Sequence, residues 1–217
     1  MRLTRRFLVA GATSLLLAGT MVVSAGAAAL PTAPGQNKLQ CFSGTTDVSI
    51  YGGTCTLFGN GAKGPAILSN SDGNPNGDYA GVYIANSTLT NAPLGSITQL
   101  GYTYVGNIAP TPTDLSLNIP ISSTGSGVTD YGYAFIDAYY CPGVFGVVDV
   151  INDPTCGIWY FGTNTSDYFA NWTAFVAAYP SATVANDNLP FIIAERTPGT
   201  PAQLWTISNV VLGKPGK

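Results

Sequence analysis

Carboxylates are the side chains with the most potential for chemistry in this chain, because the sequence contains no histidine. The lack of histidine excludes serine and cysteine nucleophiles activated by histidine, and a zinc ion bound through histidine. What remains is a pair of acidic side chains of the kind used in glycoside hydrolysis. The single glutamate is Glu195, and its partner would be an aspartate such as Asp137 or Asp149. No acid-x-acid pattern places two carboxylates on one face of a strand, so the sequence favours a protein without catalytic activity.

The densest group of oxygen-bearing side chains follows a regular spacing in the sequence. Asp72, Asn74, Asn76 and Asp78 occupy every second position, as in the first half of an EF-hand calcium loop. Tyr83 stands where such a loop has its bidentate glutamate. Asn and Gly also form tight turns between strands, since they tolerate positive φ. We interpret the segment as a turn, with a weak structural calcium site as the alternative.

A second acidic group consists of Asp149, Asn152 and Asp153, close to Cys156. Two carboxylates at this place could hold a metal ion or bind the hydroxyls of a sugar. The sequence Asn-Asp-Pro is also typical of a turn that opens a new strand. The turn is the favoured interpretation.

Aromatic residues are numerous, with 12 Tyr, 9 Phe and 3 Trp, whereas charged residues make up only 9% of the chain. Flat rings can stack on the apolar faces of sugars, while carboxylates and amides bind the hydroxyls. We expect exposed rows of such residues to form a ligand-binding surface. The candidate ligand-binding residues are Tyr102, Tyr104, Tyr131, Tyr133, Asp137 and Tyr139. Tyrosine also favours strands in general, so packing of these rings in the core is the alternative.

The four cysteines indicate disulfide bonds and hence an oxidising compartment. Three pairings are possible, and the favoured one joins Cys41 to Cys55 and Cys141 to Cys156. Each bond would close a local loop of about 15 residues, which contributes about 3 kcal/mol in the chain-entropy model.

The amino-terminal residues predict export. Three arginines at positions 2, 5 and 6 precede an apolar run over residues 7–23 and a small-residue stretch over residues 24–29, as in a secretory signal peptide. The pair Arg5 and Arg6 also resembles a twin-arginine signal, with the general secretion route as the alternative. The apolar run is shorter than the roughly 20 residues of a membrane-spanning helix. We therefore predict a signal peptide over residues 1–29 and a secreted or cell-envelope location.

Removal of residues 1–29 would take away three arginines and leave five cations against eleven acids, a net charge of −6. No cluster of Lys and Arg remains to contact phosphate backbones. We expect no nucleic-acid partner and no membrane span after cleavage.

Short stretches with alternating apolar residues, separated by Gly, Pro and Asn, predict an all-β protein. The expected strands cover residues 47–51, 55–58, 66–68, 79–85, 100–104, 115–121, 131–139, 145–150, 158–161, 191–194 and 205–211. One helix is expected near residues 171–179, where Trp172, Phe175, Val176 and Tyr179 share one face. The predicted organisation is a signal peptide, a flexible segment over residues 30–38 and one antiparallel β-sandwich over residues 39–217.

The closing strand over residues 205–213 and the aromatic-rich stretch over residues 131–140 resemble secreted β-sandwich domains of the jelly-roll or concanavalin-like kind, which include many carbohydrate-binding modules. The chain also looks like a family of small exported bacterial proteins without an assigned function. The resemblance implies a jelly-roll-like sandwich and favours sugar binding. The preferred hypothesis is an exported, non-catalytic protein that binds a polysaccharide or cell-wall glycan, with calcium as the candidate cofactor. The alternatives are a secreted glycoside hydrolase-like enzyme and an envelope-associated structural or interaction protein.

Overall fold

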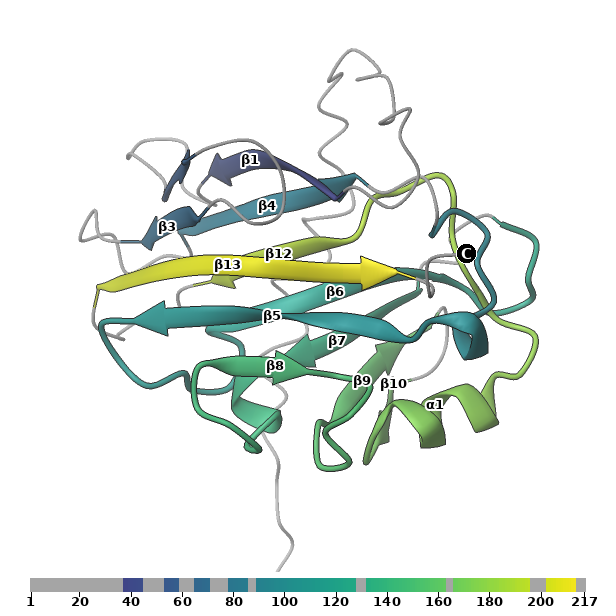
Figure 1. Ribbon diagram of the computed structural model, residues 1–217. Coiled ribbons are helices and arrows are strands. Elements are labelled where there is room, and N and C mark those ends of the chain that lie inside the picture. Colours follow the sequence, from purple (N-terminus) through teal and green to yellow (C-terminus); the bar gives the residue numbers. More distant parts are fainter. Residues whose placement is uncertain are drawn as a thin grey trace, which may run out of the picture.

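The computed structural model describes residues 37–44, 53–58, 65–70, 78–85, 89–127, 132–162, 166–195 and 202–213. Within these residues the chain forms two antiparallel sheets that pack face to face (Figure 1). The predicted signal peptide lies outside the described residues, as does the strand expected over residues 47–51. No helix in the described part of the chain has the length and apolar character needed to cross a bilayer.

The larger sheet has the strand order β1-β4-β12-β6-β7-β9-β10, and β11 pairs with β6 beside this path. Its strands are β1 (Lys38–Gly44), β4 (Tyr79–Ala85), β6 (Leu115–Ser122), β7 (Gly132–Asp137), β9 (Ile158–Phe161), β10 (Ser166–Phe169), β11 (Thr183–Val184) and β12 (Phe191–Glu195).

The smaller sheet has the order β2-β3-β13-β5-β8. Its strands are β2 (Thr54–Leu57), β3 (Ala66–Asn70), β5 (Gln99–Gly106), β8 (Val147–Asp149) and β13 (Gln203–Gly213). Two short 3-10 helices, η2 (Leu94–Ser96) and η3 (Ala138–Tyr140), lie in the connections.

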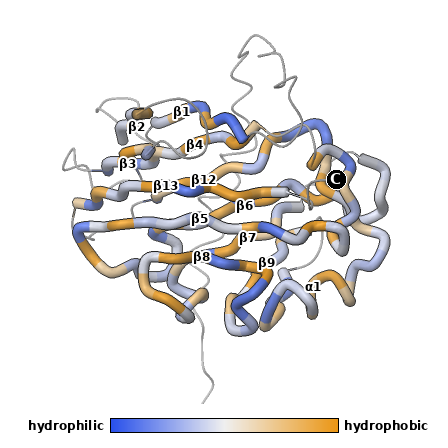
Figure 2. Tube along the Cα trace, in the orientation of Figure 1, coloured by the Kyte–Doolittle hydropathy of each residue, from blue (hydrophilic) through white to orange (hydrophobic). Residues whose placement is uncertain are grey.

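Alternation along the strands builds the core between the sheets. In β6, Leu115, Leu117, Ile119 and Ile121 all point inward and are almost completely buried. Apolar residues recur in this way along the strands of both sheets (Figure 2). Full burial of one such side chain contributes about 1.5–3 kcal/mol, so this alternation fixes which face of each strand meets the core.

The predicted helix is confirmed as α1 (Trp172–Ala178). The side chain of Asn171 caps its start by accepting a hydrogen bond from the Ala174 amide at 2.9 Å. Phe175 is fully buried and its ring contacts Tyr160 of β9 and Phe169 of β10. The helix therefore covers the inner face of the larger sheet at the β9–β10 end, beside the smaller sheet (Figure 1). The all-β sandwich with one short helix is confirmed.

Both favoured disulfide bonds are present, Cys41–Cys55 and Cys141–Cys156. The first joins β1 of the larger sheet to β2 of the smaller sheet. The second closes the loop that contains β8. Two disulfides indicate a non-reducing environment.

Three strands were not anticipated from the sequence: β1, β10 and β11. Strand β1 begins at Lys38, and the side chain of the preceding Asn37 donates to the Val210 carbonyl at 3.0 Å. Strands β10 and β11 are short and carry no apolar alternation. These two strands can be recognised only from their pairing with neighbouring strands of the sheet.

Candidate ligand-binding face

The outward face of the larger sheet brings together side chains from segments that are distant in the sequence. In β4, Val82 and Ile84 are buried against the core, whereas Tyr79 and Tyr83 point outward, as the alternation predicted. The register then aligns one residue from each strand in a central row. This central row is Gln40, Tyr83, Phe191, Asn118, Phe135, Trp159 and Tyr168.

Eleven rings on this face and at its end form one unbroken chain of contacts, which we call the aromatic band. Its members in order are Tyr79, Phe42, Tyr83, Phe191, Tyr133, Phe135, Phe161, Trp159, Tyr168, Tyr140 and Tyr139. The centroids of successive rings lie between 4.4 and 6.4 Å apart. None of these residues is fully buried, and Tyr83, Tyr168 and Tyr139 are exposed. A band of partly exposed rings is typical of a binding surface rather than of a core.

Strand β6 supplies small and polar side chains at the middle of this face. Its outward residues are Ser116, Asn118, Pro120 and Ser122, and all are buried. Tyr133 on β7 and Phe191 on β12 meet with centroids 5.7 Å apart, and β6 lies between their two strands. The two rings must therefore meet over β6, where Phe191 pairs with Asn118 and Tyr133 pairs with Pro120.

Asn118 is the buried polar residue at the centre of the central row. Its Nδ2 donates to the hydroxyl of Ser116 at 3.0 Å, but its Oδ1 has no hydrogen-bond partner among the described residues. A buried amide oxygen without a partner costs about 1–3 kcal/mol. A buried polar atom of this kind calls for an explanation, and a functional role is one of them.

Gly81 permits the close approach of a ring at the β1 edge of the face. A Cβ atom at this position would lie 2.3 Å from the Phe42 ring and 2.5 Å from the Ile192 carbonyl oxygen. Phe42 therefore lies directly over Gly81, where it contacts both Tyr83 and Phe191.

Two acidic side chains lie at one end of the face. Asp137, at the end of β7, is buried and accepts hydrogen bonds from the backbone amides of Thr113 and Tyr139. Burial raises the pKa of Asp137 to about 6; the two hydrogen bonds oppose this rise and the charge of Asp114 adds to it. Glu195 ends β12 on the same face, where burial and then the charge of Asp137 raise its pKa to about 7. Two neighbouring carboxyls with raised pKa values are a feature of functional sites, although structural networks produce it as well.

Asp114 lies close to these two acids but belongs to a hydrogen-bond network inside the sandwich, in which its carboxylate is fully paired. Its carboxylate accepts hydrogen bonds from the amide and hydroxyl of Thr111 and from Nε2 of Gln203, at 2.7, 2.6 and 2.7 Å. The Oε1 atom of Gln203 accepts from Trp205 and Asn70, both at 3.3 Å. This network ties the start of β6 to β13 and β3, so Asp114 has a structural role.

The tyrosines of the band present neutral hydroxyl groups. Burial is the main cause that raises the pKa values of Tyr79, Tyr83, Tyr133 and Tyr140 above the ordinary value of 10.0. These hydroxyls therefore stay protonated at neutral pH and can both donate and accept hydrogen bonds.

The structure brings three of the six expected ligand-binding residues to this face: Tyr133, Asp137 and Tyr139. The expectation of an exposed row is wrong for Tyr102 and Tyr104, which are only 2% and 6% exposed. They point from β5 into the core, on the same side as Leu100, while Thr103 and Val105 face outward. Tyr131 lies outside the described residues.

The expected calcium site cannot be placed as a whole, because Asp72, Asn74 and Asn76 lie outside the described residues. Asp78 is described and is buried directly before β4. In the described part of the chain, no cluster of three or more Cys, Asp and Glu side chains is arranged to hold a metal ion. The calcium site stays a prediction.

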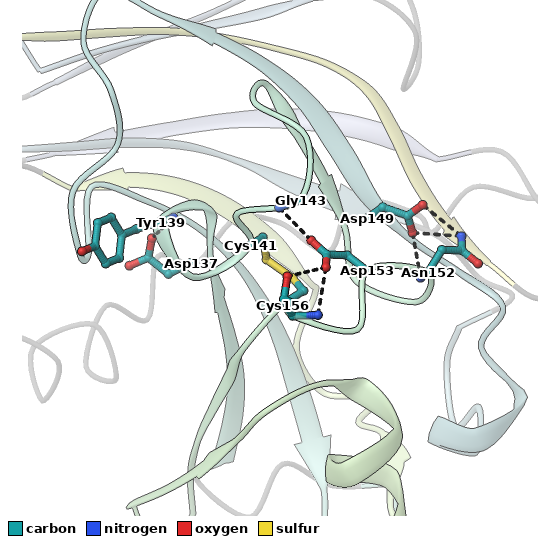
Figure 3. The surroundings of a disulfide bond; sticks show 9 residues. Asp137, Tyr139, Cys141, Gly143, Asp149, Asn152, Asp153 and Cys156 are labelled. Atoms are coloured by element: carbon teal, nitrogen blue, oxygen red, sulfur yellow. Dashed lines mark hydrogen bonds between the residues drawn. A yellow bond between two sulfur atoms is a disulfide. The ribbon is translucent and has the colours of Figure 1, made fainter.

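The second acidic group forms the turn that the sequence favoured. The side chain of Asn152 donates to Asp149 at 2.9 and 3.1 Å, and Asp153 accepts from the amide and hydroxyl of Thr155 (Figure 3). Asp153 also accepts from the Gly143 amide at 3.1 Å. Although desolvation opposes it, the hydrogen bonds from Thr155 and Gly143 lower the pKa of Asp153. These contacts order the loop around Cys141–Cys156 (Figure 3).

Most of the aromatic band was missed by reasoning from the sequence. The missed residues are Phe42, Tyr79, Tyr83, Phe191, Phe135, Trp159, Phe161 and Tyr168. Their alternation with buried residues was visible in β4, but the pairing of β4 with β12 and β1 was not. The surface becomes apparent only when the sheet order is known.

The band continues to a shallow pocket of about 200 Å³ at the end of the sandwich. Tyr139, Tyr104, Pro110 and Phe145 are among its lining residues. Tyr139 is thus shared between the band and the pocket.

The fold and this face define an all-β sandwich with an aromatic surface on its larger sheet. Comparisons with models of protein families, with curated proteins and with solved structures find no match to this chain. The functional hypothesis therefore depends on the residues of the site.

Proposed function

We propose that this protein binds an extracellular polysaccharide or cell-wall glycan through the aromatic band and does not cleave it. The single observation that carries the proposal is the unbroken chain of partly exposed rings across the larger sheet. Aromatic rings provide apolar area for sugar faces, and tyrosine adds a polar group at the ring edge.

Three further features support the proposal. The two-sheet sandwich agrees with the resemblance to jelly-roll and carbohydrate-binding domains. The disulfide bonds fit an exported protein, as does the predicted signal peptide. Asn118 and Asp137 are a buried amide and a buried carboxyl on the same face, and Glu195 is partly exposed beside the rings, where its carboxyl can bind hydroxyl groups.

The test is retention of the exported chain on insoluble cellulose, chitin and isolated cell walls. We expect retention on at least one of them without release of soluble sugar. Replacement of Trp159 by Ala should abolish retention, because this ring joins two others in the band. Phe58→Ala is the matched control, since Phe58 is exposed but lies outside the band. If the parent protein is retained on none of these materials, the proposal is wrong.

A second candidate function, glycoside hydrolysis, is favoured by the raised pKa values of Asp137 and Glu195. A carboxyl that remains protonated near neutral pH can act as a general acid, and a second carboxyl can act as base or nucleophile. Release of reducing sugar by the parent protein, and its loss in Glu195→Gln with retained binding, would establish this activity. Retention without release would leave only the binding function.

A further inference from the structure

We infer that the ligand of the aromatic band is an uncharged glycan in extended form, which lies across the strands from β4 to β10. This inference rests on the proposed function. It adds the direction, the length and the charge of the ligand.

The direction follows from how the rings are distributed over the sheet. A single strand carries at most two rings of the band, such as Tyr133 and Phe135 on β7 or Trp159 and Phe161 on β9. Across the strands, by contrast, the contacts run from β1 to β10 without interruption. A ligand that lies along one strand would meet at most two rings. A ligand that lies across the strands would meet one or two rings at every strand except β6.

The length follows from the spacing of the strands. Tyr83 on β4 and Tyr168 on β10 are the two outermost aromatic residues of the central row. Five steps between neighbouring strands separate them, and each step is about 4.8 Å, which gives a path of about 24 Å. A disaccharide cannot reach both tyrosines, but an oligosaccharide of several rings can.

The charge follows from the residues around the band. The charged residues on the outward face of the described strands are Lys38, at the start of β1, and the acids Asp137 and Glu195. No described cation lies in the central row, so among the described residues a glycan with carboxylates or sulfates would find no cationic partner along the row, and it would be repelled at the acidic end. Neutral tyrosine hydroxyls suit the hydroxyls of an uncharged sugar.

The unpartnered amide oxygen of Asn118 lies at the middle of this path. Asn118 is fully buried, and its neighbours across the sheet are Phe191 and Phe135. If either ring turns aside, a ligand hydroxyl or a water molecule can donate to Oδ1 and satisfy a group that otherwise has no partner.

The test is calorimetric titration of the exported chain with cello- and chito-oligosaccharides, from disaccharide to hexasaccharide. We expect the affinity to increase at least tenfold over this series. Oligogalacturonates of matched length, which carry carboxylates, should bind at least tenfold more weakly than the best neutral hexasaccharide. Equal binding of the disaccharide and hexasaccharide, or equal binding of the charged series, would overturn the inference.

Two variants at the outermost rings of the row test the direction. Tyr83→Ala and Tyr168→Ala should each weaken binding of the hexasaccharide at least threefold, whereas no more than one of them should affect the disaccharide. The conservative variants Tyr83→Phe and Tyr168→Phe keep the ring and should retain most of the affinity, and Phe58→Ala should change nothing. Melting temperatures of all variants report whether they fold.

The outcomes separate the inference from the proposed function. If neutral glycans bind but only one of the two alanine variants weakens the hexasaccharide, the cross-strand path is wrong and glycan binding stands. If no glycan binds, both are wrong.

Discussion

Tyr133 and Phe191 touch, with ring centroids 5.7 Å apart, although β6 separates their strands. The contact is possible because β6 presents small and polar side chains on this face. The centre of the band is therefore two rings that bridge a strand, with Phe191 opposite the buried Asn118 and Tyr133 opposite Pro120. On the outward face of β6, the side chains that would favour stability therefore differ from those that would favour binding.

Replacement of Asn118 by Leu should raise the free energy of unfolding by about 1 kcal/mol, because it removes a buried oxygen without a partner. The same change at Gln203, a buried amide with three hydrogen bonds, should instead lower stability by about 2 kcal/mol or more. Urea denaturation of the two variants measures both effects. A loss of stability in Asn118→Leu would mean that the lost hydrogen bonds to Ser116, or an ordered water on the oxygen, outweigh the cost that the substitution removes.

The protein should become more stable as the pH is lowered from about 8 to about 5. The raised pKa values of Glu195 and Asp137, about 7 and about 6, mean that the folded state binds more protons than the unfolded state in this range. The stability from these groups is fully present below the unfolded pKa values of about 4 and is lost as the pH rises through the folded values. Melting temperatures over this pH range measure the effect.

Glu195→Gln should flatten this pH profile, because glutamine cannot ionise. Asp137→Asn should flatten its lower part in the same way. If the melting temperature of Glu195→Gln depends on pH as steeply as that of the parent protein, Glu195 is not the group that titrates.

Loss of either disulfide should lower the free energy of unfolding by about 3 kcal/mol in the chain-entropy model. The two loops are almost equal in length, with sequence separations of 14 and 15, so the two double Cys→Ala variants should lose similar amounts. Guanidinium denaturation measures both. A much larger loss for the Cys41–Cys55 pair would show that its link between the sheets matters beyond loop closure.

Gly81→Ala should destabilise the protein by about 1–3 kcal/mol, because the added Cβ would overlap the Phe42 ring and the Ile192 carbonyl. It should also weaken binding at the β1 edge of the band. Gly95→Ala is the matched control, since the nearest atom would lie at an ordinary distance of 3.5 Å. Equal melting temperatures of the two variants would contradict the prediction.

Local patterns in the sequence predicted what depends on local structure. The spacing of Trp172, Phe175 and Tyr179 placed the helix, and alternation assigned the two faces of β4. The cysteine pairs were also predictable, because each closes a short loop.

The binding face was less predictable, because it depends on contacts between distant segments. Phe191 stands opposite Asn118, and neither position indicates the other in the sequence. Tyr102 and Tyr133 both belong to alternating stretches, yet one ring is in the core and the other is on the surface. The useful signal in β5 was Leu100, which shares a face with Tyr102 and so marks that face as the inner one.

The position of the Cys41–Cys55 bond has a consequence for where the protein can work. Phe42, which follows Cys41 directly, lies over Gly81 at the edge of the band. The covalent link between the sheets therefore also holds the outermost ring in place. In a reducing compartment β1 would keep its pairing with β4 but lose this link, so the outermost ring would be held less firmly than in the oxidised protein.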